Sequence, residues 1–256
     1  MGIIKKWINR LTHQSAVRGR QGEEQICEIL TRSTRFRCKG KLLHNLYIPR
    51  GNEETTEIDV LYITKKGLFV IESKNYSGCI FGHSQQPNWT VSLYTGKKNW
   101  WGKTKMENHS FYNPIVQNKT HIHFLKKYVK DDVQTFSFIV FSQNATLKDV
   151  TVSEPDVVVC RQQELMRRMK KLWWRRPNTL SKDEVNALYQ QLLPLAGQKK
   201  SVQKKHIRDV KKRTAHAPIC PQCGAKLVLR CADTPQPFYG CERYPKCQYT
   251  RKLWQS

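Results

Sequence analysis

Two pairs of closely spaced cysteines near the C-terminal end of this 256-residue chain have the residue type and spacing of a metal site. Cys220 and Cys223 form one pair in CPQCG, and Cys241 and Cys247 form the other in GCERYPKC. Four thiolates from two tight turns are the ligand set of a single tetrahedral Zn²⁺ ion. The alternatives are unrelated buried thiols or two disulfides. Because the chain shows no secretory context that would favour disulfides, the pattern favours structural zinc.

The residues around these cysteines predict a small basic module that binds nucleic acid. Cys231 lies outside both turns and is expected to be a spare thiol, and residues 227–229 are expected to form a short strand. Aromatic and cationic side chains on a metal-held platform suit base stacking and phosphate contact. The expected contacts in the module are Arg230, Phe238, Tyr239, Arg243 and Lys246.

A second set of reactive side chains lies in two β-rich segments that are joined by a short turn at 65–67. Asp59 is in the first segment, and Glu72 and Lys74 are in the second. If the turn centres on its two lysines, Asp59 lies directly opposite Glu72, and Lys74 points to the same face two residues further on. A bulge at Gly67 would shift this register by one residue.

Two neighbouring carboxylates repel each other unless a positive charge lies close to both. A divalent cation with oxygen ligands would neutralise Asp59 and Glu72 and leave Lys74 to face a scissile phosphate or an attacking water. The structural alternative is a salt-bridged cluster at a sheet edge, with Lys74 neutralising one acid. The spacing alone does not separate the two interpretations.

The hydrophobic pattern predicts an α/β fold in which helices flank a mixed central sheet. The segment 76–112 is expected to be an irregular strand-and-loop excursion. Within it, Trp100 and Trp101 are interpreted as cover for the sheet edge in preference to base-stacking residues. Ser181 and Glu184 have the spacing of a capping box. The predicted helices span 19–31, 113–130, 162–174 and 181–193, and the strands span 42–48, 58–64, 68–75, 136–142 and 156–160.

The net charge of +25 indicates a polyanionic partner, with nucleic acid ahead of a membrane surface. Residues 161–256 hold 22 Lys/Arg against 6 Asp/Glu, so the basic excess is concentrated in the second part of the chain. No apolar run reaches the roughly 18 residues that span a bilayer, so no stable membrane insertion is expected. The start MGIIKKWINRL is interpreted as a solvated helix in preference to a membrane-surface helix, and the expected location is cytoplasmic.

The segment EIDVLYITKKGLFVIESKNYSG resembles the core of the nuclease-related domain (NERD), a member of the restriction-endonuclease-like group with a D…E-x-K signature. GRQGEE and NPIVQ are similar to two further motifs of this domain. The resemblance implies that Asp59 and Glu72 hold Mg²⁺ or Mn²⁺ and that Lys74 activates water or stabilises the charge on the phosphate. It also implies supporting roles for Glu23, with Glu24 as the alternative, and for Gln117, which could instead cap or bridge backbone.

The string CPQCGAKLVLR…FYGCERYPKCQYT resembles the four-cysteine zinc fingers at the C-terminus of bacterial type I DNA topoisomerases. It departs from them at Pro235, Gln236 and Pro237, which affects loop contacts and not the metal ligands. The resemblance implies a DNA-binding module without strand-breaking chemistry. Topoisomerase activity of the chain's own is not expected, because no region resembles the catalytic parts of those enzymes.

These observations predict four parts of the chain, each with its own role. The basic linker, either a coil or a helix, is expected to follow a nucleic-acid strand through Lys204, Lys205, Lys211, Lys212 and Arg213. The parts are an N-terminal segment (1–17), a nuclease-related α/β domain (18–195, motif core 18–130), the linker (196–217) and a zinc finger (218–256).

The predicted function is a DNA-binding protein with a divalent-metal-dependent endo- or exodeoxyribonuclease domain, whose zinc finger holds the DNA. One alternative is a non-catalytic DNA-binding adaptor that works with a topoisomerase or another DNA-processing or repair enzyme. Another is a module directed to RNA. His121 and His123 are expected to face different sides of their helix and not to share a metal ion.

Overall fold

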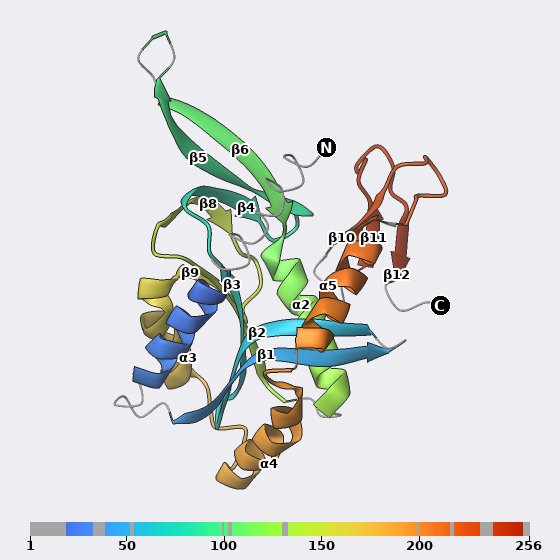
Figure 1. The fold of residues 1–256 in the computed structure, drawn as a ribbon. Helices are drawn as coiled ribbons and strands as arrows, with labels where there is room; N and C mark the ends of the chain where they lie inside the picture. Colours follow the sequence, from blue (N-terminus) through green and yellow to red (C-terminus); the bar gives the residue numbers. More distant parts are fainter. Residues whose placement is uncertain are drawn as a thin grey trace.

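The computed structural model describes residues 19–32, 39–51, 54–98, 100–101, 104–129, 133–198, 200–215, 218–230 and 238–252 (Figure 1). The expectations for residues 1–17, for Cys231 and for the sequence departure at 235–237 lie outside this part of the chain.

A five-stranded mixed sheet forms the centre of the N-terminal part, in the strand order β1-β2-β3-β7-β9. Strand β2 is antiparallel to both β1 and β3, whereas β7 runs parallel to both β3 and β9. This arrangement confirms the predicted α/β class. The strands are β1 (Gly40–Gly51), β2 (Glu54–Thr64), β3 (Gly67–Lys74), β7 (Thr135–Phe141) and β9 (Val157–Arg161).

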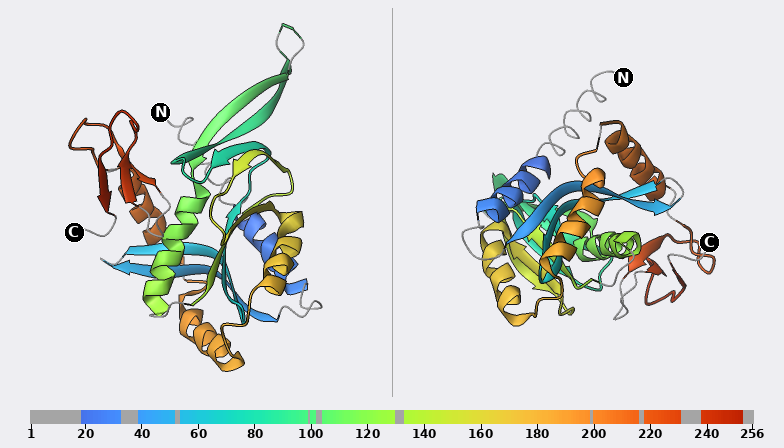
Figure 2. Two further views of the ribbon diagram at one scale, coloured as in Figure 1. Left: turned by 180° about the vertical axis from the view of Figure 1, so that it is seen from behind. Right: turned by 90° about the horizontal axis from the view of Figure 1, so that it is seen from below.

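Helices cover both faces of this sheet, which explains why β2 and β3 are apolar on both sides (Figure 2). On one face, α2 (Pro114–Val129) and α4 (Lys182–Leu192) pack through Leu125 and Leu188 onto Leu61 and Val70. On the other face, the helix of residues 19–32 and α3 (Leu165–Arg175) pack onto a second cluster that contains Phe69 and Phe138.

The predicted helix starts follow from local capping. The Ser181 hydroxyl accepts a hydrogen bond from the Glu184 N–H at 3.1 Å, and the Ser181 N–H donates to the Glu184 carboxylate at 2.7 Å. This capping box begins α4 as predicted. Short 3-10 turns, η2 (Gln162–Glu164) and η3 (Leu193–Leu195), precede α3 and follow α4.

The interpretation of 76–112 as an irregular excursion is wrong, because this segment builds most of a second sheet. Its strands are β4 (Gly78–His83), β5 (Asn88–Lys98) and β6 (Thr104–Tyr112), and β8 (Ala145–Thr151) completes the order β6-β5-β4-β8. Strands β5 and β6 form a long hairpin that projects from the body (Figure 1). Trp89 is fully buried at the base and stacks on Phe141, with ring centroids 6.2 Å apart.

The C-terminal part consists of α5 (Lys200–Ala215) and a small antiparallel sheet of β10 (Leu227–Arg230), β11 (Phe238–Cys241) and β12 (Thr250–Lys252). Of the two alternatives for the basic linker, the structure shows the helix, and α5 contacts β2. None of the helices in the described ranges combines the length and the hydropathy of a bilayer-spanning segment.

Candidate functional site

The β2–β3 hairpin has the register that the sequence predicts. Paired residues run from Thr64 and Gly67 at the turn to Val60 and Ile71 without a shift, so the next pair in the same register is Asp59 with Glu72. Gly67 has φ +119°, and a Cβ there would lie 2.1 Å from the Gln134 carbonyl oxygen. Only glycine fits this tight turn, so the turn fixes the register that brings the two acids together.

Asp59, Glu72 and Lys74 form a cluster that is called the acidic centre below, and Lys74 makes its central contacts. Its Nζ donates to Glu72 Oε1 at 2.7 Å and to Gln117 Oε1 at 3.0 Å. Burial opposes ionisation of Glu72, which is 2% exposed, but Lys74 and then His121 outweigh it and lower the Glu72 pKa to about 2. Glu72 therefore carries its charge at neutral pH. Burial opposes the charge of Lys74, but Glu72 and then Asp59 outweigh it and raise the Lys74 pKa, so the two side chains form an ion pair.

Asp59 lies against the end of β3, where its Oδ2 accepts a hydrogen bond from the Ser73 N–H at 2.8 Å. Burial, followed by the charges of Glu72 and Glu23, raises the pKa of Asp59 well above its usual value. Lys74 acts in the opposite direction but does not reverse this shift. A bound cation would remove this obstacle to ionisation, because it would offset the repulsion among the three acids.

Glu23 approaches the centre from the helix of residues 19–32. The start of this helix abuts the end of β3, since a Cβ built on Gly22 would lie 2.9 Å from Ser73 Oγ. Burial, then Glu57 and Glu72, raise the pKa of Glu23 to about 7. Glu23 is half-buried and the neighbouring Glu24 is exposed, and both line a cavity of about 460 Å³. Of the two acids considered from the sequence, Glu23 is the one electrostatically coupled to the centre.

His121 belongs to the centre, although the sequence interpretation did not include it. Its Nε2 lies 3.4 Å from Glu72 Oε2, and its Nδ1 lies 2.5 Å from Thr56 Oγ1. Within the described part of the chain, Glu72 Oε2 and His121 Nε2 are both buried without a hydrogen-bond partner. The available signal was helical spacing, because His121 follows Gln117 by four residues and so lies one turn along the same face of α2.

Glu57 is a further acid that the sequence interpretation missed. It accepts a hydrogen bond from the Tyr47 hydroxyl at 2.6 Å, and its other oxygen lies 3.7 Å from His206 Nε2. Burial raises the pKa of Glu57, partly offset by Tyr47. The alternation along β2 could have indicated this acid, because Glu57 precedes Asp59 by two residues. Nothing local indicated His206, which arrives on α5 and contacts Thr55 Oγ1 through Nδ1 at 2.9 Å.

The donor atoms of the acids do not converge on one point in this structure. Among the described residues, only the four cysteines gather as three or more potential ligand atoms within mutual coordinating distance. Lys74 Nζ donates a hydrogen bond to one oxygen of Glu72, and the Ser73 N–H donates to one oxygen of Asp59. The carboxylates have the right chemistry for Mg²⁺ or Mn²⁺, and their other oxygens remain for a cation that draws them together.

The four cysteines of the C-terminal module form a preorganised metal site. Their sulfur atoms lie within 4.8 Å of one another, with Cys220 and Cys247 3.6 Å apart and Cys223 and Cys241 3.3 Å apart. Thiolates around a tetrahedral zinc ion are about 3.8 Å apart, so the donor set fits this metal. A backbone hydrogen bond from Ala225 lowers the pKa of Cys223 to about 7, whereas burial raises the pKa of Cys241 to about 12. A bound zinc ion would hold all four cysteines as thiolates.

Family comparisons match these two sites to known modules. Residues 18–142 match the model of the nuclease-related domain (NERD). Residues 217–256 match the topoisomerase DNA-binding C4 zinc finger. Both resemblances predicted from the sequence are confirmed, and together they suggest a nuclease-like function and DNA binding.

Relatives of this chain share either most of its length or only its finger. An uncharacterized protein of Bacillus anthracis is 26% identical over 206 residues, which cover 80% of this chain and 87% of that protein. DNA topoisomerase 1 of Methanocaldococcus jannaschii is 54% identical over 35 residues, 14% of this chain and 4% of the enzyme. DNA topoisomerase 1 of Archaeoglobus fulgidus is 27% identical over 157 residues, 60% of this chain and 21% of the enzyme. No solved structure matches the chain.

The predicted DNA contacts of the C4 zinc finger differ in how accessible they are. Arg230 donates to the Cys241 carbonyl at 2.9 Å and lies over the Tyr244 ring, so it braces the finger. Phe238 and Tyr239 are half-buried, whereas Arg243 and Lys246 are exposed. On α5, Lys204 and Lys205 are exposed, and the side chains of Lys211, Lys212 and Arg213 lie outside the described residues.

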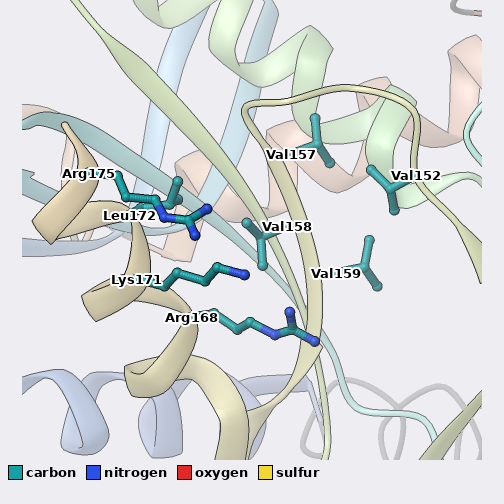
Figure 3. A pocket seen from close by; sticks show the side chains of 8 residues that line it. All are labelled: Val152, Val157, Val158, Val159, Arg168, Lys171, Leu172 and Arg175. Atoms are coloured by element: carbon teal, nitrogen blue, oxygen red, sulfur yellow. The ribbon is translucent and has the colours of Figure 1, made fainter.

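A separate cavity of about 270 Å³ lies between β9 and α3, away from the acids of the nuclease-related domain (Figure 3). Its lining combines valines of β9 with Arg168, Lys171 and Arg175 from one face of α3. None of the site residues predicted from the sequence lines this cavity, so it adds nothing to the acidic centre.

Replacing Glu23 with glutamine is expected to stabilise the protein at pH 8 and to leave its stability at pH 4 unchanged. With a folded-state pKa of about 7 against the usual 4.5, native Glu23 costs stability as the pH rises from 4.5 through 7. Since solvent screens part of this interaction, we expect a gain on the order of 1 to 2 kcal/mol above pH 7. Urea unfolding at both pH values measures it.

The matched control for this prediction is Glu24→Gln, which changes the exposed neighbour on the same helix turn. It is expected to show no such difference between pH 4 and pH 8. Equal pH dependence in the two variants would contradict the placement of Glu23 beside Glu57 and Glu72.

Proposed function

We propose that this protein is a divalent-metal-dependent deoxyribonuclease whose zinc finger holds the DNA substrate. The observation that carries the proposal is the contact of Lys74 with both Glu72 and Gln117, beside Asp59, at the end of the β2–β3 hairpin. Asp59, Glu72 and Lys74 have the order and spacing of a D…E-x-K signature, within a chain segment that matches the nuclease-related domain. An acid pair with a buried ammonium suits hydrolysis of a phosphodiester.

In this proposal, Asp59 and Glu72 hold Mg²⁺ or Mn²⁺. The metal, when bound, supplies Lewis-acid activation of the scissile phosphate and of the attacking water. Lys74 stabilises the negative charge that develops on the phosphate, and Gln117 holds the lysine side chain in place. His121 orients Glu72 from the opposite side, and Glu23 adds negative charge that favours a cation.

Helix α5 and the zinc finger bind the substrate in this proposal. Structural zinc holds the finger, and its exposed Arg243 and Lys246 contact phosphates together with Lys204 and Lys205 of α5. The proposed location is the cytoplasm, because thiols stay reduced there and can bind zinc. A topoisomerase or another DNA-processing enzyme is the proposed protein partner, because the finger is shared with such enzymes.

Cleavage of DNA by the purified protein tests the enzymatic proposal. Native protein is expected to cleave single- or double-stranded DNA in the presence of Mg²⁺ or Mn²⁺. The cleavage rate of Asp59→Asn is expected to be lower by at least about 100-fold. Asp156→Asn is the matched control, since Asp156 is paired with Arg176 at 2.6 Å, outside the centre. Equal rates for native protein and Asp59→Asn would refute the nuclease.

One observation favours a second candidate, a non-catalytic DNA-binding adaptor. Lys74 already neutralises Glu72, and the acids do not converge on one point, as in a structural ion-pair cluster. In that case no metal supports cleavage, and salt-sensitive DNA affinity is unchanged in Glu72→Gln. The same assay, repeated with RNA, separates the nuclease, the adaptor and an RNA-directed module.

A further inference from the structure

The tip of the β5–β6 hairpin presents two adjacent tryptophans to solvent. Trp100 and Trp101 are 95% and 81% exposed. At about 3.3 Å per residue, the 11 residues of β5 extend roughly 36 Å, and the ribbon shows the hairpin projecting well beyond the body (Figure 1). The interpretation of these residues as cover for the sheet edge is therefore wrong. The fully buried Trp89 packs at the hairpin base instead.

Exposed indoles at the end of a projection indicate a contact surface, because large aromatic groups lose free energy in water and gain it on stacking. A single exposed aromatic residue is ordinary, but two in succession at a tip place an unusually large apolar area in water. Neither indole contributes to any of the buried clusters of the described residues. Both rings therefore lie outside the buried core of the described residues.

The charge around the tip identifies the kind of partner. Residues 97–105 contain four lysines and no acidic residue. Lys97, at the end of β5, is exposed beside the tryptophans. Exposed indoles in a lysine-rich segment suit a strand whose bases stack on the rings and whose phosphates meet cationic side chains. Bases can stack in this way only where they are not already stacked in a duplex.

The hairpin base is tied to the acidic centre. Strand β6 ends at Tyr112, and α2 begins two residues later and carries Gln117 in its first turn. Between them, the Asn113 side chain donates to the Ser84 carbonyl at 2.9 Å and to the Gln86 carbonyl at 2.6 Å. These contacts fix the base of the hairpin against the β4–β5 turn. The hairpin therefore ends beside the start of α2, the helix whose Gln117 accepts a hydrogen bond from Lys74.

We propose that the hairpin tip is a stacking site for unpaired bases, and that it directs the protein to single-stranded DNA or to junctions with a single-stranded arm. This inference rests on the proposed function and specifies its substrate class. Trp100 and Trp101 stack on one or two bases, and the lysines of 97–105 hold the adjoining phosphates. The zinc finger and α5 bind the backbone independently of the tip.

Fluorescence anisotropy with a labelled thymidine oligomer of about 20 nucleotides, and with a duplex of the same length, tests the inference. The double variant Trp100→Ala/Trp101→Ala is expected to bind the oligomer at least about 20-fold more weakly and the duplex within about twofold of native. Trp100→Phe/Trp101→Phe is expected to retain most of the affinity, because a phenyl ring still stacks.

Trp174→Ala is the matched control, since Trp174 is also exposed (77%) but lies on α3. It is expected to leave both affinities unchanged. Thermal unfolding of every variant is expected to match native protein, because the tip contributes no buried contact to the clusters of the described core.

Three outcomes would overturn the inference. Native-like affinity of the double alanine variant for the oligomer excludes base stacking at the tip. Tryptophan-dependent sedimentation with phosphatidylglycerol–phosphatidylcholine vesicles, without an effect on DNA, shows a lipid surface as the partner. Tryptophan-dependent dimerisation shows a second copy as the partner. By contrast, a native protein that binds no DNA of any form refutes the proposed function itself.

Discussion

Lys74→Met is expected to reduce metal-dependent DNA cleavage about 1000-fold while leaving DNA affinity within about twofold of native. Methionine keeps the length of the side chain but removes the ammonium that contacts both Glu72 and Gln117. Without that ammonium, the proposed centre loses the protein's own positive charge beside the phosphate. Single-turnover cleavage at saturating protein measures the chemical step separately from binding.

Loss of folding could imitate this result, so the control must break a comparable ion pair elsewhere. Lys119→Met serves, because Lys119 is also mostly buried, with 14% side-chain exposure, and contacts Glu154 at 2.6 Å. Both variants leave a carboxylate without its partner, which costs about 3 kcal/mol or more where the pair is buried. If both lower the unfolding midpoint but only Lys74→Met stops cleavage, the effect is chemical. Native-like cleavage by Lys74→Met would exclude the proposed role.

Cys241→Ser is expected to remove the bound zinc and to unfold the C-terminal module, with a loss of DNA affinity of 10-fold or more. The buried cluster of this module consists largely of the cysteines themselves with Ala225 and Leu227, so little remains to hold it without metal. Elemental analysis is expected to give one zinc per native chain and less than a tenth of that in the variant. Faster alkylation of the module's remaining cysteines at near-neutral pH reports the unfolding.

The control for this variant is Cys27→Ser, which changes a half-buried thiol outside the module. It is expected to keep full zinc content and native DNA affinity. The domain that carries the acids has its own cores, so its unfolding midpoint is expected to be unchanged in Cys241→Ser. Full zinc content in Cys241→Ser would exclude the four-cysteine site.

The parts that the sequence predicted best are those that local rules determine. The register of Asp59 with Glu72 follows from a tight turn that needs glycine and from strands with two apolar faces. The start of α4 follows from the hydrogen bonds between Ser181 and Glu184. The four-cysteine cluster follows from metal-ligand spacing. In each case a short spacing of characteristic residue types carries the signal.

The parts that sequence reasoning missed depend on contacts between distant segments. The β5–β6 hairpin lacks a clean apolar alternation because most of it faces solvent on both sides, so its pattern resembled an irregular excursion. His121 entered the centre only because α2 packs with that face over Glu72. His206 reaches Thr55 across 151 positions of the sequence, and no local pattern reports such a contact.

The contact of His206 has a mechanical consequence for the protein. Its imidazole fastens the basic arm α5 to the strand that carries Glu57 and Asp59. Moving α5 away from the sheet requires breaking the contacts of this ring with Thr55 and Glu57, and Glu57 then loses its neighbouring imidazole. Movement of α5 and the solvent exposure of Glu57 are therefore coupled through one side chain.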